Sequence, residues 1–212
     1  GILNTTAVIA LYFALQHTTL TKANMLNWTF PVFVFLFSPF INRERPLLSQ
    51  YGFLGLTMVG MSLVISPDFS TINIGDAAAF LSGILGGAAV SVLRESRKHD
   101  DTFMVLFYLM MIGTFLNGVL AAPFFILPPL PVLFLVVSSA LCGFLAQILI
   151  TTSSRHLEAP IASVLMTSGI VIAGAMGVLF FGETLTIKIL IGGACILVSI
   201  VGVSGILHRK GV

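Results

Sequence analysis

Charged side chains are scarce in this sequence. Asp, Glu, Lys and Arg make up 8% of its 212 residues, whereas an average soluble domain has about 25%. Hydrophobic residues make up 57%, and the mean hydropathy is +1.08. A water-soluble fold of this size could not bury so much apolar surface. The composition therefore excludes a soluble domain and indicates an all-α integral membrane protein, because helices satisfy their own backbone hydrogen bonds in lipid.

Cysteine is also scarce, and motifs for catalysis are missing. Cys142 and Cys195 both lie in apolar segments, where we interpret them as small core residues and not as a disulfide or a metal pair. The sequence contains no Cys/His cluster with metal-ligand spacing, no HExxH and no Ser/His/Asp arrangement. His99-Asp100-Asp101 comes nearest to a catalytic cluster, and a solvated loop explains it better. We expect no metal, no cofactor, no catalytic residue and no enzyme.

Long apolar segments are what the sequence has in abundance. A helix needs roughly 20 apolar residues to cross the hydrocarbon core of a bilayer. About eight segments reach or nearly reach that length, and the connections between them leave no room for a soluble domain. The predicted transmembrane helices are 2–16, 23–41, 48–65, 74–93, 103–126, 131–152, 160–181 and 187–207.

The basic residues predict how these helices are oriented. If Gly1 is cytoplasmic, the outside connections hold Lys22 and Lys188 alone. The other eight basic residues fall on the cytoplasmic side: Arg43, Arg45, Arg94, Arg97, Lys98, Arg155, Arg209 and Lys210. This asymmetry is typical of membrane proteins, whose cytoplasmic loops carry an excess of Lys and Arg. We expect the protein to lie in a cell membrane, above all a bacterial inner membrane, with both chain ends in the cytoplasm.

The sequence resembles itself at an offset of 139 residues. The matched pairs are His17 with His156, Ala23 with Ala162, Leu26 with Leu165, Val32 with Val171, Glu44 with Glu183, and Val64 with Val203. Five predicted spans separate the two glutamates, and an odd number inverts the second copy in the bilayer. We interpret 1–66 as three spans of a truncated first repeat and 74–207 as a complete second repeat of five. Two further spans are expected ahead of Gly1. Inverted repeats are typical of secondary transporters.

The motifs of both copies resemble the EamA domain of the drug/metabolite transporter superfamily. In the first copy they are Ala14-Leu15-Gln16-His17-Thr18-Thr19, Ala23, Pro31-Val32-Phe33, Arg43-Glu44-Arg45, Gly52 and Gly60. In the second they are Gly75-Asp76, Phe181-Gly182-Glu183-Thr184-Leu185 and Gly192-Gly193. The resemblance implies ten spans in two inverted five-span repeats. It also implies a central cavity lined by the first, second, sixth and seventh spans counted here. Ile170 departs from the pattern, which has a proline opposite Pro31.

Neutral polar residues provide the candidate substrate site. No Asp, Glu, Lys or Arg falls in the middle of a span, which argues against a buried carboxylate relay and a strongly charged substrate. One helical face of the second span carries Asn24, Asn27, Trp28 and Pro31, and the matching stripe of the seventh carries Ser163, Met166, Thr167 and Ile170. Gln147 is a further candidate. These groups suit a mid-sized polar or amphipathic solute; the alternative is hydrogen bonding between helices.

The two matched glutamates and the small residues bear on how the helices pack. Glu44 and Glu183 are expected to pair with a nearby arginine or to cap a helix, with a gate as the alternative. Small residues such as Ser82-Gly83 and Gly86-Gly87 predict close helix contacts. Together the patterns favour a carrier that moves a small organic metabolite by alternating access; an integral-membrane enzyme or a channel is the alternative. The expected partners are a small-molecule substrate and the lipid bilayer, with no nucleic acid, and a homodimer is left open.

Overall fold

The fold is known from a computed structural model that describes residues 1–65, 72–124, 126–181 and 186–209. Glu183, one of the two glutamates matched above, lies outside these ranges. All regular structure within them is helical, and no strand occurs there. The elements are α1 (Ile2–His17), α2 (Leu20–Asn27), α3 (Phe30–Ile41), α4 (Leu48–Ile65), α5 (Ile74–His99), α6 (Thr102–Ala121), the 3-10 turn η1 (Ala122–Phe124), α7 (Leu130–Ser153), α8 (Ala159–Met166), α9 (Ser168–Phe181) and α10 (Ile187–Arg209).

The predicted spans agree with these helices. Seven stretches of the described chain are long and apolar enough to cross a membrane, and α1 is a shorter apolar helix. In this count α2 with α3, and α8 with α9, each form one stretch. The all-α, multi-pass membrane fold is therefore confirmed. Three boundaries are wrong: α2 begins at Leu20, three residues before the predicted start, and α6 ends at Ala121, five residues before the predicted end. The residues from Arg94 onward, expected in a loop, continue α5 as far as His99. Hydropathy marks where a helix leaves the lipid, and good helix formers such as Arg and Glu carry it further.

Short-range signals set the beginnings of several helices. Asn73 and Asp76 form a capping box at the start of α5, in which each side chain accepts a hydrogen bond from the other's backbone N–H. Prolines occupy the first turn of α3, α7 and α8, where their missing N–H costs nothing. These local signals explain why the ends of the apolar runs predict most boundaries.

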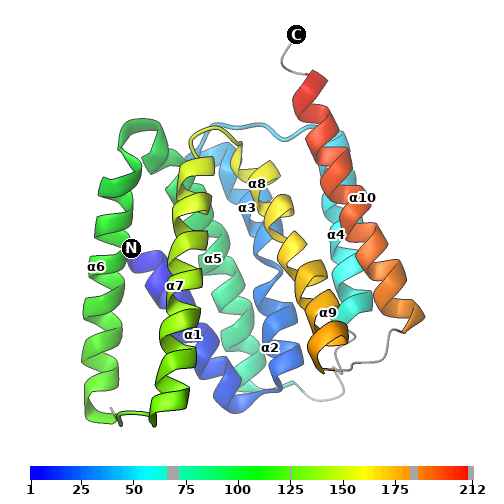
Figure 1. Cartoon of the computed structure of the whole chain (residues 1–212). Coiled ribbons are helices and arrows are strands. Elements are labelled where there is room, and N and C mark those ends of the chain that lie inside the picture. The colour runs from blue at the N-terminus through cyan, green and yellow to red at the C-terminus, as the bar shows by residue number, and fades with distance from the viewer. Residues whose placement is uncertain (66–71, 125, 182–185, 210–212) are drawn as a thin grey trace.

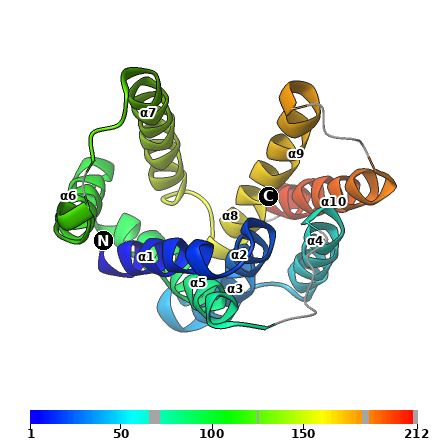
Figure 2. The same ribbon diagram turned by 90° about the horizontal axis from the view of Figure 1, so that it is seen from below.

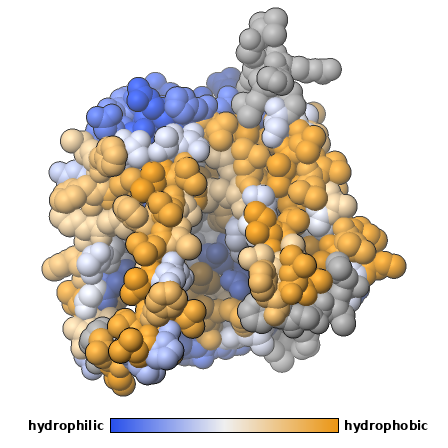
Figure 3. Space-filling view, viewed as in Figure 1, coloured by the Kyte–Doolittle hydropathy of each residue, from blue (hydrophilic) through white to orange (hydrophobic). Residues whose placement is uncertain are grey.

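The two ends of the helix bundle differ in charge. The last turns of α5, with Arg94, Arg97 and Lys98, and the turn after α7, with Arg155, lie at the end drawn uppermost in Figure 1, which we call the basic end. Hydrogen bonds there join Arg94 to Glu44 and to the Ser154 carbonyl, and join Glu44 to the Ala159 N–H. Between the basic end and the opposite end, apolar residues cover most of the face in Figure 3, and hydrophilic residues gather along its upper edge. A belt of this kind is what a membrane-spanning bundle presents to lipid.

Helix α5 lies at the centre of one packed unit with α1, α2 and α3. Figure 2 shows these four helices together, with α7 and α9 spread apart above them. Glycines permit the contact, as the spacing of small residues predicts. A Cβ added to Gly83 would lie 2.8 Å from the carbonyl oxygen of Leu26, and one added to Gly87 would lie 2.5 Å from the Cβ of Phe33. The backbones of α5 and α2–α3 therefore meet without a side chain between them.

A second close pair is formed by α4 and α10. A Cβ added to Gly60 would lie 2.7 Å from the carbonyl oxygen of Gly192, and one added to Gly192 would lie 2.5 Å from that of Gly60. The expectation that both cysteines lie in the core is wrong for one of them: Cys142 is exposed on α7, whereas Cys195 is half-buried beside Gly60. The two thiols are free. Hydropathy does not separate core from surface here, because lipid-facing residues are as apolar as buried ones.

Candidate functional site

Both spans that carry the polar stripes are broken, and at matching positions. Helix α2 ends at Asn27, and α8 ends at Met166, the residue matched to Asn27 at the offset of 139 residues. In the first break, Pro31 has no N–H to donate to the carbonyl of Asn27, and the Thr29 hydroxyl donates to the Leu26 carbonyl at 2.6 Å. The second break has no proline. Discontinuous helices of this kind, at the centre of two repeats, are a feature of secondary transporters.

The second break depends on two hydroxyl groups. Ser163 donates to the carbonyl oxygen of Pro160 at 2.7 Å, and Thr167 donates to that of Val164 at 2.6 Å. Both side chains are fully buried. Side-chain hydroxyls that bond to their own helix compete with the regular backbone pattern and bend it. In the structure these two candidate residues therefore shape the bend of α8–α9, and their hydroxyl protons are used within the helix.

Trp28 lies at the first break and touches both halves of the bundle. Its half-buried ring packs against one apolar cluster that includes Phe30 and Ala159, and against another that includes Met61 and Ile170. The ring centroids of Trp28 and Phe30 are 5.7 Å apart. The Trp28 ring therefore contacts residues of both broken spans.

Asn27 begins a hydrogen-bond relay between three helices. Its Nδ2 donates to the Ser82 hydroxyl of α5 at 2.7 Å, and Ser82 donates onward to the Ala7 carbonyl of α1 at 2.8 Å. The Asn27 side chain is half-buried, as is that of Asn24. Asn27 therefore has the alternative role expected for these amides, hydrogen bonding between helices. The same bond fixes the direction of the Asn27 amide.

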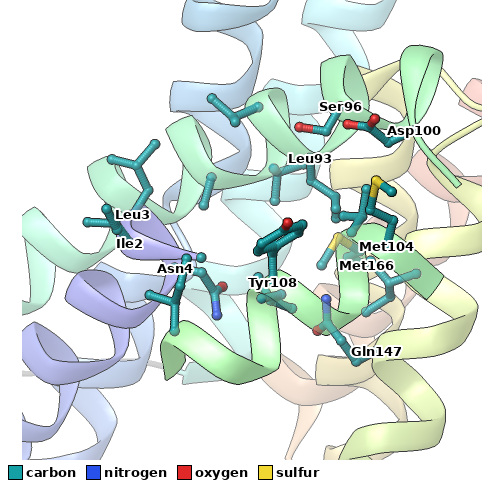
Figure 4. A pocket seen from close by; sticks show the side chains of 18 residues that line it. Ile2, Leu3, Asn4, Leu93, Ser96, Asp100, Met104, Tyr108, Gln147 and Met166 are labelled. Atoms are coloured by element: carbon teal, nitrogen blue, oxygen red, sulfur yellow. The ribbon is translucent and has the colours of Figure 1, made fainter. Parts of the chain in front are cut away.

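Gln147 and Met166 line a cavity of about 460 Å³ between α1, α5, α6 and α7. Figure 4 shows Tyr108 and Gln147 directed into it, with Ser96 and Asp100 at one end. Gln147 also borders a neighbouring cavity of about 350 Å³, together with Asn4 and Asn117. Neither lining includes Trp28 or Asn27. The structure thus divides the candidates between a cavity and the broken spans, which meet at Met166 of α8.

Lys22 and Asp76 form a buried ion pair that the sequence does not predict. Lys22 Nζ donates to Asp76 Oδ2 at 2.8 Å, and the two side chains are 5% and 7% exposed. Thr18 donates to the other carboxylate oxygen at 2.6 Å. The capping spacing from Asn73 to Asp76 was a usable signal for the carboxylate, but nothing in the sequence pointed to Lys22. Within the described ranges, no three His, Cys, Asp or Glu residues are grouped to hold a metal ion.

Glu44 pairs with an arginine, as expected, and that arginine lies on α5. Its carboxylate accepts from Arg94 Nε at 2.8 Å. The second oxygen accepts from the backbone N–H of Ala159 at 2.8 Å, which caps α8, a helix 115 residues further along the chain. Glu44 thus joins three elements at the basic end.

A sequence profile described as the EamA-like transporter family matches residues 1–66 and again 73–205. The chain belongs to this family. It is a multi-pass membrane protein of a transporter family.

Relatives of this EamA-like chain include solute carrier proteins. Solute carrier family 35 member G1 is 26% identical in mouse and 24% identical in human, over 95% of this chain. The chain spans about three fifths of those relatives, 59% and 60% of their lengths. An uncharacterized transporter of Archaeoglobus fulgidus is 25% identical over 94% of the chain and 73% of its own length. Among the solved structures that match, a crystal structure of a protein has the same fold, with a TM-score of 0.83 at 14% identity, over 98% of this chain and 75% of its own.

Proposed function

We propose that the protein is a secondary transporter that moves a small organic metabolite across a membrane by alternating access. The observation that carries the proposal is the pair of helix breaks, which end α2 at Asn27 and α8 at Met166. In the proposed organisation, 1–66 supplies three spans of one repeat and 74–207 supplies the five spans of an inverted second repeat. The breaks then lie at equivalent depths, where a carrier binds its substrate.

The proposed substrate site combines the broken spans with the adjacent cavity. Trp28 offers an aromatic face, and Asn24, Asn27 and Gln147 offer amides. Met166, which lines the cavity from α8, contributes an adaptable apolar surface. Ser163 and Thr167 act as part of the site by holding the bend of α8–α9. This division of roles follows from their buried, internally bonded hydroxyls.

The lining suits a neutral or amphipathic solute. Asp100 is the one charged residue among those that line the 460 Å³ cavity, and the remaining polar groups are amides, hydroxyls and backbone. No cationic side chain is present in that lining to neutralise an anion. Charged solutes need such partners, because desolvating a charge is costly.

A solute screen in proteoliposomes, with the complete protein, tests this function. Trp28→Ala is expected to raise the KM for the transported solute about tenfold, the equivalent of roughly 1.4 kcal/mol of lost stacking. Asn27→Ala should act in the same direction. Ser204→Ala is the control, because that hydroxyl bonds within its own helix, to Ile200, at an exposed site. Reduced protein yield with an unchanged KM would assign Trp28 and Asn27 to helix packing alone.

Solute counterflow separates the carrier from its alternatives. A carrier that exposes one site alternately to each side exchanges labelled for unlabelled solute against a gradient, whereas a channel does not. Chemical change of the solute would instead identify an enzyme.

The proposed orientation places the basic end in the cytoplasm. To test it, Cys142 and Cys195 are replaced by Ser, and one new cysteine is added at Ile72 or at His156, both exposed at opposite ends. In intact bacterial cells, an impermeant maleimide is expected to label Ile72→Cys and to spare His156→Cys until the cells are lysed. The reverse pattern would invert the topology.

A further inference from the structure

We propose that Glu44 and Arg94 form a latch that holds the basic end closed, and that its release lets this end open during transport. The inference rests on the proposed alternating access. It adds a residue pair that controls the conformational change and lies away from the substrate site. Five observations at the basic end support it, and the first is which parts of the protein the pair joins.

Both residues of the latch belong to one packed unit, and they bond to the turn between α7 and α8. Glu44 follows α3 and Arg94 lies on α5, so both residues belong to the unit of α1, α2, α3 and α5. The segment that they hold is the turn between α7 and α8. Helix α7 has sparse contacts with α5, to which Arg97 Nε also bonds it through the Thr151 carbonyl oxygen at 3.1 Å, whereas α8 also packs on α3. The polar bonds at the turn therefore act together with this packing to hold the basic end closed.

The bonds on the α7–α8 turn come from both members of the ion pair. Glu44 Oε2 accepts from the Ala159 N–H at 2.8 Å, at the first residue of α8. Arg94 Nη1 donates to the carbonyl oxygens of Ser154 and Arg155, at 2.9 and 2.7 Å, just past the end of α7. Each charge also meets the favourable end of a helix dipole, the carboxylate at an N-terminus and the guanidinium at a C-terminus.

Solvent is largely kept from the pair that makes these bonds. The side chains of Arg94 and Glu44 are 15% and 10% exposed, and Arg94 Nε lies 2.8 Å from Glu44 Oε1. Removing one partner of such a pair is costly, because it leaves a charge that is poorly solvated. The Lys98–Glu95 pair at the same end differs: it is about one third exposed and joins residues of one helix.

The backbone turns sharply to deliver Glu44. Arg43 has φ of 57°, the one positive φ of a non-glycine residue in the described part of the chain. Helix α3 ends at Ile41, two residues before it, and the Glu44 N–H donates to the Ser38 carbonyl at 3.4 Å. Left-handed backbone is unfavourable for residues other than glycine, and it persists where the surroundings hold it. The turn aims the carboxylate across the end of the bundle toward α8.

The shape of the bundle agrees with a closed basic end. In Figure 1, α7 and α8 meet at the basic end. Figure 3 shows a hollow on the same face, between α7 and α9 and nearer the opposite end, with hydrophilic residues in its depth. Seen from that opposite end in Figure 2, α7 and α9 diverge. Alternating access requires the closed end to open in turn, which the bonds of Glu44 and Arg94 on the turn oppose.

Distance measurement across the basic end tests the latch without any solute. Spin labels are placed at His99→Cys on α5 and His156→Cys on the turn, both exposed, with Cys142 and Cys195 replaced by Ser in the complete protein. Pulsed electron paramagnetic resonance in nanodiscs then reports the distance distribution. The unaltered latch is expected to give mainly a short distance. Glu44→Ala, which removes both bonds of the carboxylate, should raise the ratio of long to short distances at least tenfold.

Other variants separate a latch from a merely structural contact. Glu44→Gln keeps an acceptor for Ala159 and loses the charge, so a smaller shift is expected; Arg94→Gln should match Glu44→Ala. Glu95→Gln is the control, because Glu95 bonds to Lys98 of α5 and to Asn42 at the end of α3, both in the same packed unit, and it should leave the distances unchanged. Folded variants with wild-type distances would overturn the proposal. Failure of all three latch variants to fold would also overturn it, since a bond that opens during transport cannot be required for folding.

Failure of the latch and failure of the proposed function can be told apart. If the unmodified protein moves no solute in the screen, the transport proposal fails, whatever the distances show. If it transports and the distances do not respond to Glu44→Ala or Arg94→Gln, the latch alone fails.

Discussion

Asp76→Ala is expected to lower the free energy of unfolding by about 3–5 kcal/mol, the cost typical of removing one partner from a buried ion pair. The variant loses three interactions of one carboxylate. These are the ion pair with Lys22, the hydrogen bond from the Thr18 hydroxyl and the bond from the Asn73 N–H that completes the capping box of α5. Lys22, 4% exposed, then stays buried without its carboxylate. Unfolding of the detergent-solubilised protein by heat or denaturant measures the change.

Two further variants identify the cause of this loss. Lys22→Met combined with Asp76→Ala should cost less than Asp76→Ala alone, because the buried ammonium is removed with its partner. Asp101→Ala is the matched control: Asp101 is the N-cap residue of α6, but its side chain makes no capping bond. If Asp101→Ala destabilised the protein as much as Asp76→Ala, the buried pair would not explain the effect.

Gly87→Ala is expected to destabilise the protein by about 1–3 kcal/mol, although alanine favours a helix more than glycine does. The added Cβ would lie 2.5 Å from the Cβ of Phe33 and 2.8 Å from the Phe30 carbonyl oxygen. The second of these is backbone, so α3 and α5 must move apart. The midpoint of thermal unfolding should fall accordingly.

The neighbouring glycine supplies the control for this prediction. In Gly86→Ala, the added Cβ would lie 3.6 Å from the Cβ of Phe30, an ordinary van der Waals distance. The gain in helix propensity, up to about 1 kcal/mol, then acts without a clash, and stability should stay the same or rise. Equal losses for the two variants would show that α3 and α5 adapt, and that their separation is not set by Gly87.

Local residues predicted some features of the site and not others. Pro31 predicts a weak point in the second span, and the structure ends α2 four residues earlier, at Asn27. The break after Met166 was not foreseen, because Ile170 stands where a proline was expected. Its bend comes with the hydroxyl bonds of Ser163 and Thr167, and the sequence alone cannot say whether such hydroxyls bond within a helix or across helices.

The sequence by itself determined the class of the protein and most of the helix ends. These depend on the hydropathy of contiguous residues and on caps such as Asn73, which act over a few positions. Only the tertiary structure decided that Cys142 faces outward, that Lys22 meets Asp76 across 54 residues, and that Glu44 reaches α8 across 115. In lipid, core and surface are equally apolar, so hydropathy cannot place a helix face. The partners of charged groups depend on which helices lie side by side, and packing of whole helices decides that.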